Sequence, residues 1–118
     1  MSETTNTPPR ILREQLRLGA GFASKERDHV LEILSPLDRH LAHWHAEQVD
    51  LEVTVKDRGG PEQKVTLETW LPHWPSVVAT AAGRELDHAL IEARKELIRQ
   101  IEDKKSKHEM GTGRRGPA

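Results

Sequence analysis

The sequence predicts an α+β fold, a two-layer β-α-β-β-β-α sandwich in which two helices cover one face of a four-stranded sheet. Three observations predict it. Apolar and polar residues alternate over Val49–Lys56 and again over Lys64–Leu71, which is typical of strands with one buried face. Apolar residues recur every three or four positions over Val30–Leu41 and over Leu86–Ile101, which indicates amphipathic helices. We expect the sheet to be antiparallel, with helices burying its apolar face.

The first expected element is a strand over Ile11–Gly21. Leu12, Leu16 and Leu18 stand among polar residues there, and glycines end the segment. A strand followed directly by helical periodicity would start the β-α part of the predicted order.

A helical region follows, with Ser24 as its N-cap and an end near Trp44. Pro36 interrupts it, because proline lacks an amide N–H and clashes with the preceding turn. We expect the helix to restart there, with Ser35 as the cap and Pro36 as the first residue of the second piece.

Two hairpins then connect three strands. Asp57–Pro61 is a glycine-rich turn, and Leu71–Pro75 turns the chain again before a short strand over Ser76–Ala82 and the final helix. Segments 1–10 and 110–118 lack apolar periodicity, so we expect disordered tails on a single domain that spans 11–109.

Composition excludes several classes of protein. The chain has 118 residues, a formal net charge of −1 and no cysteine, which excludes disulfides, thiolate zinc sites and cysteine nucleophiles. No stretch approaches the roughly 20 apolar residues that cross a bilayer, so we expect a cytoplasmic protein without membrane contact. The nearly neutral net charge argues against indiscriminate coating of nucleic acid, so any such binding needs a local basic patch.

No catalytic or cofactor motif is present. The serines lie in no G-x-S-x-G elbow, and the glycine pairs lack the strand-to-helix context of a phosphate loop. We therefore predict no enzyme, no cofactor and no small-molecule substrate. A metal site at His40, His43 and His45 is an alternative, with His73 beside Trp74 as a further histidine. The spacing of these residues, however, matches neither H-E-x-x-H nor paired zinc ligands. We predict no metal, and metal bound to the purified protein would overturn this.

RNA binding is the function that the basic residues favour. Six of them fall within fourteen residues of the last helix: Arg94, Lys95, Arg99, Lys104, Lys105 and Lys107. Such a helix can present cations to phosphates. The alternative is a helix laced with ion pairs, because Glu92, Glu96, Glu102 and Asp103 are interspersed. By strand parity Trp70 projects away from Val65 and Leu67, where it would stack a base or pack against a loop or partner.

A motif in the last third adds a resemblance. The stretch from Val77 through Gly83-Arg-Glu-Leu86, continuing to Leu97-Ile-Arg-Gln-Ile101, resembles the last strand, turn and helix of the ribosome hibernation-promoting factor and ribosome-associated inhibitor family, also known as sigma-54 modulation proteins. The resemblance extends over Leu12 to His108. It implies a fold similar to a double-stranded-RNA-binding domain, and a stress-time inhibitor that docks in the decoding region of the small ribosomal subunit and blocks mRNA and tRNA.

Carried over position by position, the resemblance implies rRNA contacts at Arg99 and in the basic run of Lys104, Lys105 and Lys107, with Arg39 and His40 as weaker candidates. Arg94 and Lys95 complete the predicted RNA-binding set. The chain resembles the short members of the family, which lack a second, dimerising domain.

The sequence departs from the family's pattern at Pro36, Asp87 and Glu96. The alternative function is a protein-interaction or homodimerisation module that uses the exposed sheet face with Trp70 and the Pro72–Pro75 loop.

Overall fold

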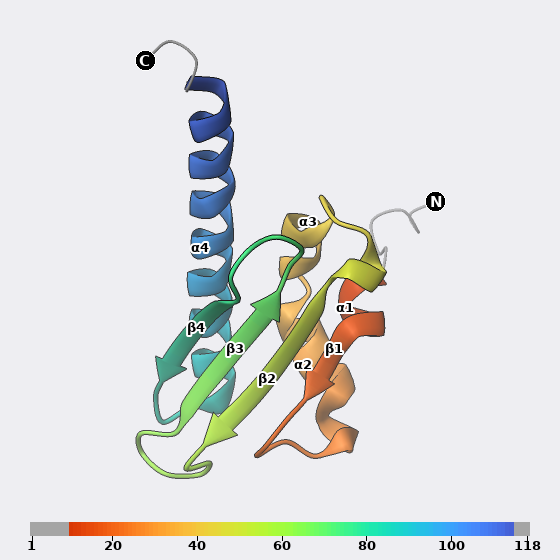
Figure 1. Ribbon diagram of the computed structural model, residues 1–118. Coiled ribbons are helices and arrows are strands. Elements are labelled where there is room, and N and C mark those ends of the chain that lie inside the picture. The colour runs from red at the N-terminus through yellow and green to blue at the C-terminus, as the bar shows by residue number, and fades with distance from the viewer. Residues whose placement is uncertain (1–9, 115–118) are drawn as a thin grey trace, which may run out of the picture.

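A four-stranded sheet with α2, α3 and α4 packed on one face forms the molecule, as Figure 1 shows with the strands in front of these helices. The computed structural model describes residues 10–114. The predicted α+β class is confirmed. The elements are, in order, α1 (Arg10–Gln15), β1 (Leu16–Leu18), η2 (Ser24–Glu26), α2 (Arg27–Leu34), α3 (Leu37–Leu41), η3 (Ala46–Gln48), β2 (Asp50–Lys56), β3 (Lys64–Trp70), β4 (Val77–Ala82) and α4 (Leu86–Arg114).

The strands lie in the order β1-β2-β3-β4, and the sheet is mixed. β2, β3 and β4 form the predicted antiparallel meander. β1 pairs with β2 in parallel, with Leu16 opposite Leu51, so the expectation of a wholly antiparallel sheet is wrong. The reason is that β1 and β2 are joined by a long helical crossover, which returns the chain in its original direction.

The strand predicted over Ile11–Gly21 is wrong in its first half, because Arg10–Gln15 is helical. Side chains from distant helices hold both ends of this short helix. A carboxylate oxygen of Asp38 accepts the amide N–H of Leu12 at 3.0 Å. The guanidinium of Arg27 donates to the carbonyl oxygens of Arg13 and Leu16, at 2.9 and 2.7 Å. Tertiary contacts therefore satisfy some of the end groups that a six-residue helix leaves open.

After β1 the chain continues alongside β2 for a few residues. The amide of Gly19 donates to the carbonyl oxygen of Val53 at 2.8 Å, and the amide of Val55 donates to Ala20. Gly21 has φ of +93°, and a Cβ there would lie 2.4 Å from the carbonyl oxygen of Val55. Only glycine fits this close approach, so the predicted glycine end of the segment is confirmed.

The helical region breaks at the predicted proline. α2 ends at Leu34 and α3 begins at Leu37, with Pro36 as its N-cap residue, so the prediction of Ser35 as the cap and Pro36 as the first helical residue is wrong by one residue. The region starts at Ser24 as a 3-10 turn whose N-cap is Ala23. The carboxylate of Glu26 accepts the Ala23 amide at 2.9 Å, so the prediction of Ser24 as N-cap is wrong by one residue.

The core lies between the sheet and the helices. The inward residues of β2 and β3 are buried, whereas the alternate residues lie on the uncovered face. The helices contribute a stripe of fully buried side chains: Val30, Leu34, Leu37, Leu41, Leu90, Ala93, Leu97 and Ile101. Burial of this apolar surface is the main force that holds the two layers together.

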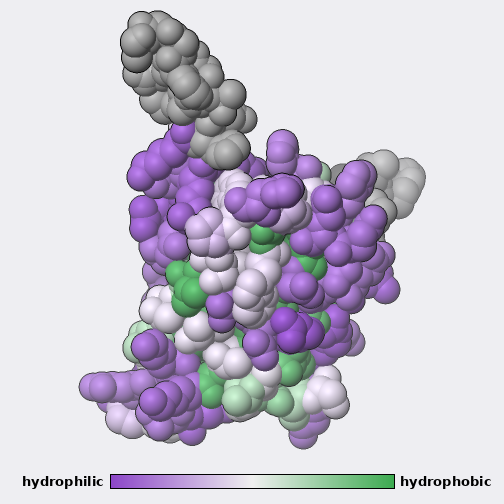
Figure 2. All heavy atoms as spheres, in the orientation of Figure 1, coloured by the Kyte–Doolittle hydropathy of each residue, from purple (hydrophilic) through white to green (hydrophobic). Residues whose placement is uncertain are grey.

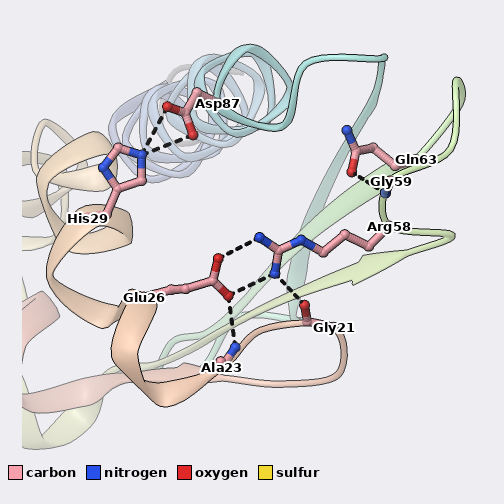
Figure 3. Close-up of polar contacts among 8 residues, drawn as sticks. All are labelled: Gly21, Ala23, Glu26, His29, Arg58, Gly59, Gln63 and Asp87. Atoms are coloured by element: carbon pink, nitrogen blue, oxygen red, sulfur yellow. Dashed lines mark hydrogen bonds and ion pairs between the residues drawn. The ribbon is translucent and has the colours of Figure 1, made fainter.

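Figure 3 shows the polar contacts at the β2–β3 turn, which lies at the end of the sheet opposite the β3–β4 loop (Figure 1). Arg58, in the β2–β3 turn, pairs with both carboxylate oxygens of Glu26 and donates to the carbonyl oxygen of Gly21. The hydrogen bond from Arg58 lowers the pKa of Glu26 to about 2. His29 on α2 contacts Asp87 at the start of α4, 2.9 Å from Nε2 to Oδ2. Asp87, a departure from the family's pattern, therefore has a partner in this chain.

α4 is the longest element and continues through Arg114, into the segment predicted as a tail from residue 110. The rest of that tail, 115–118, and segment 1–9 of the N-terminal tail lie outside the described residues. Within residues 10–114, no helix is long and apolar enough to cross a membrane.

Candidate nucleic-acid interface

The predicted RNA-binding residues of α4 separate into three environments. The first lies between α4 and α2, and the second lies beside the edge strand β4. The third lies near the β3–β4 loop, past which α4 continues (Figure 1). The surroundings of each side chain decide which of them can bind phosphate.

Arg94 joins α4 to α2. Its Nη1 donates to the carbonyl oxygen of Ile33 at 2.8 Å, and the side chain is partly buried. Its Nε is buried without a hydrogen-bond partner among the described residues. Arg94 therefore serves the packing of two helices and has little capacity left for an external phosphate.

Lys95 and Arg99 lie beside β4 in a groove of about 490 Å³ that Glu92 and Glu96 also line. Arg99 pairs with Glu96 at 2.6 Å, and Lys95 pairs with Glu92 at 3.7 Å. The hydrogen bond from Arg99 lowers the pKa of Glu96 and raises that of Arg99. The two cations thus face two carboxylates, and the groove offers a phosphate no excess of positive charge. The expected ion-pair lacing of the helix holds here and continues along α4 with Lys105–Glu102 and Lys107–Asp103.

The third environment combines basic and aromatic side chains from three elements. The C-terminal half of α4 meets the residues that follow α3 and the loop between β3 and β4. We call this group the aromatic–basic cluster, and it consists of His43, Trp44, His73, Trp74, Lys104, Lys105 and Lys107.

Aromatic contacts hold the cluster together. The rings of Trp44 and Trp74 meet edge to face, 5.2 Å apart at 86°. His43 meets Trp44 in the same way at 5.0 Å. The Nζ of Lys105 lies 5.7 Å from the centre of the Trp44 ring, within the range of a cation–π contact. The two tryptophans are half-buried, so they give the cluster a rigid base.

Glu102 links the cluster to α3. Its Oε2 lies 2.7 Å from Nδ1 of His40 and 3.2 Å from Nζ of Lys105. The hydrogen bond from His40, followed by the one from Lys105, lowers the pKa of Glu102. The side chain of Lys105 is only 24% exposed, so this lysine orients Trp44 and Glu102 more than it faces solvent.

A hollow of about 310 Å³ opens on the cluster, lined by His73, Trp74, Pro75, Lys104 and Lys107. Two lysines and one aromatic ring thus face the same space. Lys107 pairs with Asp103 at 3.5 Å, but its side chain is 77% exposed. Among the residues that line the hollow there is no carboxylate. A positively charged hollow with an aromatic wall suits a nucleotide, whose phosphate binds the lysines and whose base stacks on the ring.

The loop that carries His73 and Trp74 is held in an uncommon conformation. His73 has φ of +67°, in the left-handed region that non-glycine residues rarely adopt. The amide of Trp74 donates to the carbonyl oxygen of Leu71 at 3.2 Å, which closes the turn. Local strain of this kind is frequent where a side chain is positioned for binding.

Other predicted residues lie elsewhere. Arg39 is exposed on α3. Trp70 projects from the uncovered sheet face, as parity predicted, but the guanidinium of Arg17 lies 5.5 Å over its ring. Among residues 10–114 no three metal-ligating side chains converge, and His40 and His43 engage Glu102 and Trp44 instead.

The sequence patterns did not predict that the Trp74 loop lies beside the basic run of α4. The length of α4 could have predicted this contact. α4 starts beyond β4 and runs back along it, so that Gln100 donates to the carbonyl oxygen of Val78 at 3.0 Å. At roughly 1.5 Å per residue, Lys104 and Lys107 reach about 6 and 10 Å further, beyond the start of β4. That is the position of the β3–β4 loop.

Comparison with solved structures supports the fold. The N-terminal domain of Protein Y from Thermus thermophilus matches with a TM-score of 0.58 at 20% identity, over 74% of this chain and 94% of that domain. A ribosomal subunit interface protein from Coxiella burnetii matches with a TM-score of 0.60 at 10% identity, over 78% of this chain and 98% of that protein. No family model and no curated protein matches the sequence. The predicted resemblance to the hibernation-promoting factor family is therefore confirmed in the fold.

Proposed function

We propose that this protein is a ribosome-associated inhibitor of translation, without enzymatic activity, that acts in the cytoplasm under stress. It binds rRNA of the small subunit near the decoding region and occupies space that mRNA and tRNA need. The observation that carries the proposal is the aromatic–basic cluster, on a fold similar to that of a ribosomal subunit interface protein.

The chemistry of the cluster favours folded or single-stranded RNA over a small ligand. The hollow is shallow and open, and the lysines at its rim stand on a helix that continues away from the domain. Lysines on such a helix can follow a phosphate backbone, while Trp74 offers a ring to an unpaired base. Binding of this kind needs no cofactor and inhibits by occupancy.

The roles of the basic residues follow from their surroundings. Lys104 and Lys107 contact phosphate directly, and Lys105 holds Trp44 and Glu102 in place. Arg39 adds to the positive potential at longer range, whereas the charges of Arg99 and Lys95 are offset by Glu96 and Glu92. Arg94 secures α4 against α2 and contacts RNA least.

Co-sedimentation with small ribosomal subunits over a salt series tests the proposal. Lys104→Glu/Lys107→Glu should abolish pelleting at moderate salt. Neutralisation by Lys104→Gln/Lys107→Gln should lower the slope of log affinity against log salt by roughly two, because two phosphate contacts are lost. The matched control is Lys95→Gln/Arg99→Gln, which removes the same charge from the same helix and should retain most of the binding.

Circular dichroism and thermal unfolding establish that each variant is folded. If the wild-type protein fails to pellet with small subunits at low salt, the proposed function is wrong. If Lys104→Gln/Lys107→Gln and Lys95→Gln/Arg99→Gln weaken binding equally, RNA does not use the cluster in preference to the rest of α4.

A further inference from the structure

The uncovered face of the sheet carries charges in ordered rows. Glu52 and Glu68 lie opposite each other in the β2–β3 register, and so do Lys56 and Lys64. Between them lies a row of threonines, in which Thr54 pairs with Thr66 and Thr66 pairs with Thr80. Figure 2 looks onto this face, where side chains of near-neutral hydropathy occupy much of the centre and hydrophilic ones the margins.

These rows place like charges opposite each other, which is unfavourable within one molecule. The carboxylates of Glu52 and Glu68 form no ion pair or hydrogen bond with any described side chain, and the same holds for the ammonium groups of Lys56 and Lys64. Elsewhere in residues 10–114 most cations of α4 have an acidic partner on their own helix. Arg17 lies opposite Glu52 in the β1–β2 register, with its guanidinium over Trp70. Glu68, Lys56 and Lys64 are therefore the charges of this face that have neither an ion-pair partner nor a cross-strand countercharge among the described residues, and they point to a partner outside the chain.

The spacing of the rows is self-complementary. Alternate residues of a strand are roughly 7 Å apart, so the glutamate and lysine rows lie about equally far from the threonine row, on opposite sides. A two-fold axis along the threonine row exchanges the two charged rows. Stacked in this way, a second copy brings Lys56 over Glu52 and Lys64 over Glu68, with β2 over β2 and β3 over β3.

Two sheets can stack symmetrically around a two-fold axis that runs either parallel to the strands or along the threonine row. The charges favour the second arrangement. An axis parallel to the strands would place lysine over lysine and glutamate over glutamate, which repels. The axis along the threonines sets the glutamate row of one copy over the lysine row of the other and brings small β-branched side chains against each other at the centre. Val78, a large apolar residue with 41% exposure, then faces Ala82 of the second copy.

We propose that the uncovered sheet face is a homodimer interface, in which the glutamate and lysine rows of two copies pair around a two-fold axis along Thr54, Thr66 and Thr80. The occupant is a second copy of this chain, because the rows match each other in number, spacing and charge. The interface is isologous, as most dimer interfaces are. It lies on the sheet, whereas the aromatic–basic cluster lies at the loop end of α4, so this proposal is independent of the proposed function.

The size and polarity of the face set the expected strength of association. Three strands and three rows form a patch at the small end of specific interfaces, and its attraction is largely electrostatic. We expect a dimer that dissociates at micromolar concentration, and more readily as salt is raised.

A pair of charge-reversal variants tests the proposal by sedimentation equilibrium of the full chain over a concentration series at low salt. Lys56→Glu/Lys64→Glu makes both rows acidic and should be monomeric. Glu52→Lys/Glu68→Lys makes both rows basic and should also be monomeric. An equimolar mixture of the two variants should form a heterodimer, because every row then faces an opposite charge. The fourfold exchange of all these residues in one chain should restore the homodimer.

The matched control is Arg13→Glu/Lys25→Glu, which changes net charge by the same amount on exposed residues outside the sheet face and should dimerise like the wild type. A wild-type protein that is monomeric up to the millimolar range overturns the proposal. So does a homodimer that survives both reversals, or a mixture of the two reversed variants that stays monomeric.

Discussion

Arg94 and Arg99 are two arginines on one helix, five residues apart, with different tasks. Arg94 is half-buried and donates to the last turn of α2, whereas the side chain of Arg99 is 66% exposed and pairs with Glu96. The sequence predicts RNA contact for both, because composition and spacing do not reveal burial. What distinguishes them is the carbonyl oxygen of Ile33, which only the folded chain brings to Arg94.

This difference predicts opposite effects of the same substitution. Arg94→Met should lower the free energy of unfolding by roughly 1–3 kcal/mol, because it leaves a partly buried carbonyl without its charged donor. Arg99→Met should change it by less than about 1 kcal/mol, because exposed ion pairs contribute little. Urea unfolding of both variants measures this. Equal losses of stability would contradict the structural role assigned to Arg94.

Glu26 shows how a single ion pair makes stability depend on pH. Its pKa falls from 4.5 to about 2, chiefly through the hydrogen bond from Arg58. A carboxyl whose folded pKa is depressed stabilises the fold above its unfolded pKa, and that contribution is lost as the pH falls from about 4.5 toward 2. The pair ties the β2–β3 turn to η2 (Figure 3).

We therefore predict that Glu26→Gln lowers the urea midpoint at pH 7, and that its difference from the wild type narrows steadily below pH 4.5. The matched control is Glu47→Gln on η3, an exposed carboxylate that forms no ion pair within residues 10–114, which should match the wild type at every pH. A Glu26→Gln deficit that stays constant down to pH 3 would contradict the role of the ion pair.

Among the elements, those with their own periodicity are predicted from the sequence and those held by distant contacts are not. β2, β3 and β4 alternate along their whole length, and their predicted bounds differ from the observed ones by one residue at most. α1 is the opposite case. Leu12 and Leu16 fit a helical spacing as well as an alternation, and the decision comes from Asp38 and Arg27, which cap the helix from α3 and α2.

The same reasoning explains the parallel pairing of β1. Only three residues form this strand, too few for a pattern that reveals direction. Its pairing depends on the route of the helical crossover, which the break at Pro36 and the packing of α3 decide. Local sequence cannot specify such a route.

If Asp38 caps α1, then Asp38→Ala should cost about 1 kcal/mol of stability, as the loss of an N-terminal capping acceptor usually does. Asp38→Asn retains an oxygen acceptor and should lose less. Hydrogen exchange of the amides in 11–16 adds a local measurement, since the alanine variant should exchange faster there. Unchanged exchange in this segment would show that burial of Leu12, and not the cap, holds α1.

At the scale of the whole molecule, the chain has two charged surfaces of different kinds. No carboxylate lines the hollow of the aromatic–basic cluster, although Asp103 pairs with Lys107 beside it, whereas the sheet face carries equal rows of acid and base. The near-zero net charge of the chain conceals both. The first surface suits a polyanion and the second suits a copy of itself, so a dimer formed by the sheets would leave both clusters exposed.

The fold class, the basic run of α4 and the outward direction of Trp70 are all predictable from the sequence. The meeting of that run with Trp44 and Trp74 is not, because it depends on where a long helix passes two loops that are distant in sequence. The histidines beside these tryptophans suggested metal chemistry when considered alone. In the folded chain they lie with aromatic rings and lysines, which changes the chemistry that the group supports.

Chemical footprinting of small-subunit rRNA is the most direct test of the central claim that the aromatic–basic cluster binds rRNA near the decoding region. We predict that the wild-type protein protects nucleotides of the decoding region, that Lys104→Glu/Lys107→Glu loses this protection, and that Lys95→Gln/Arg99→Gln retains it. Protection confined to another part of the subunit, or the same footprint from the Lys104→Glu/Lys107→Glu variant, would contradict the account.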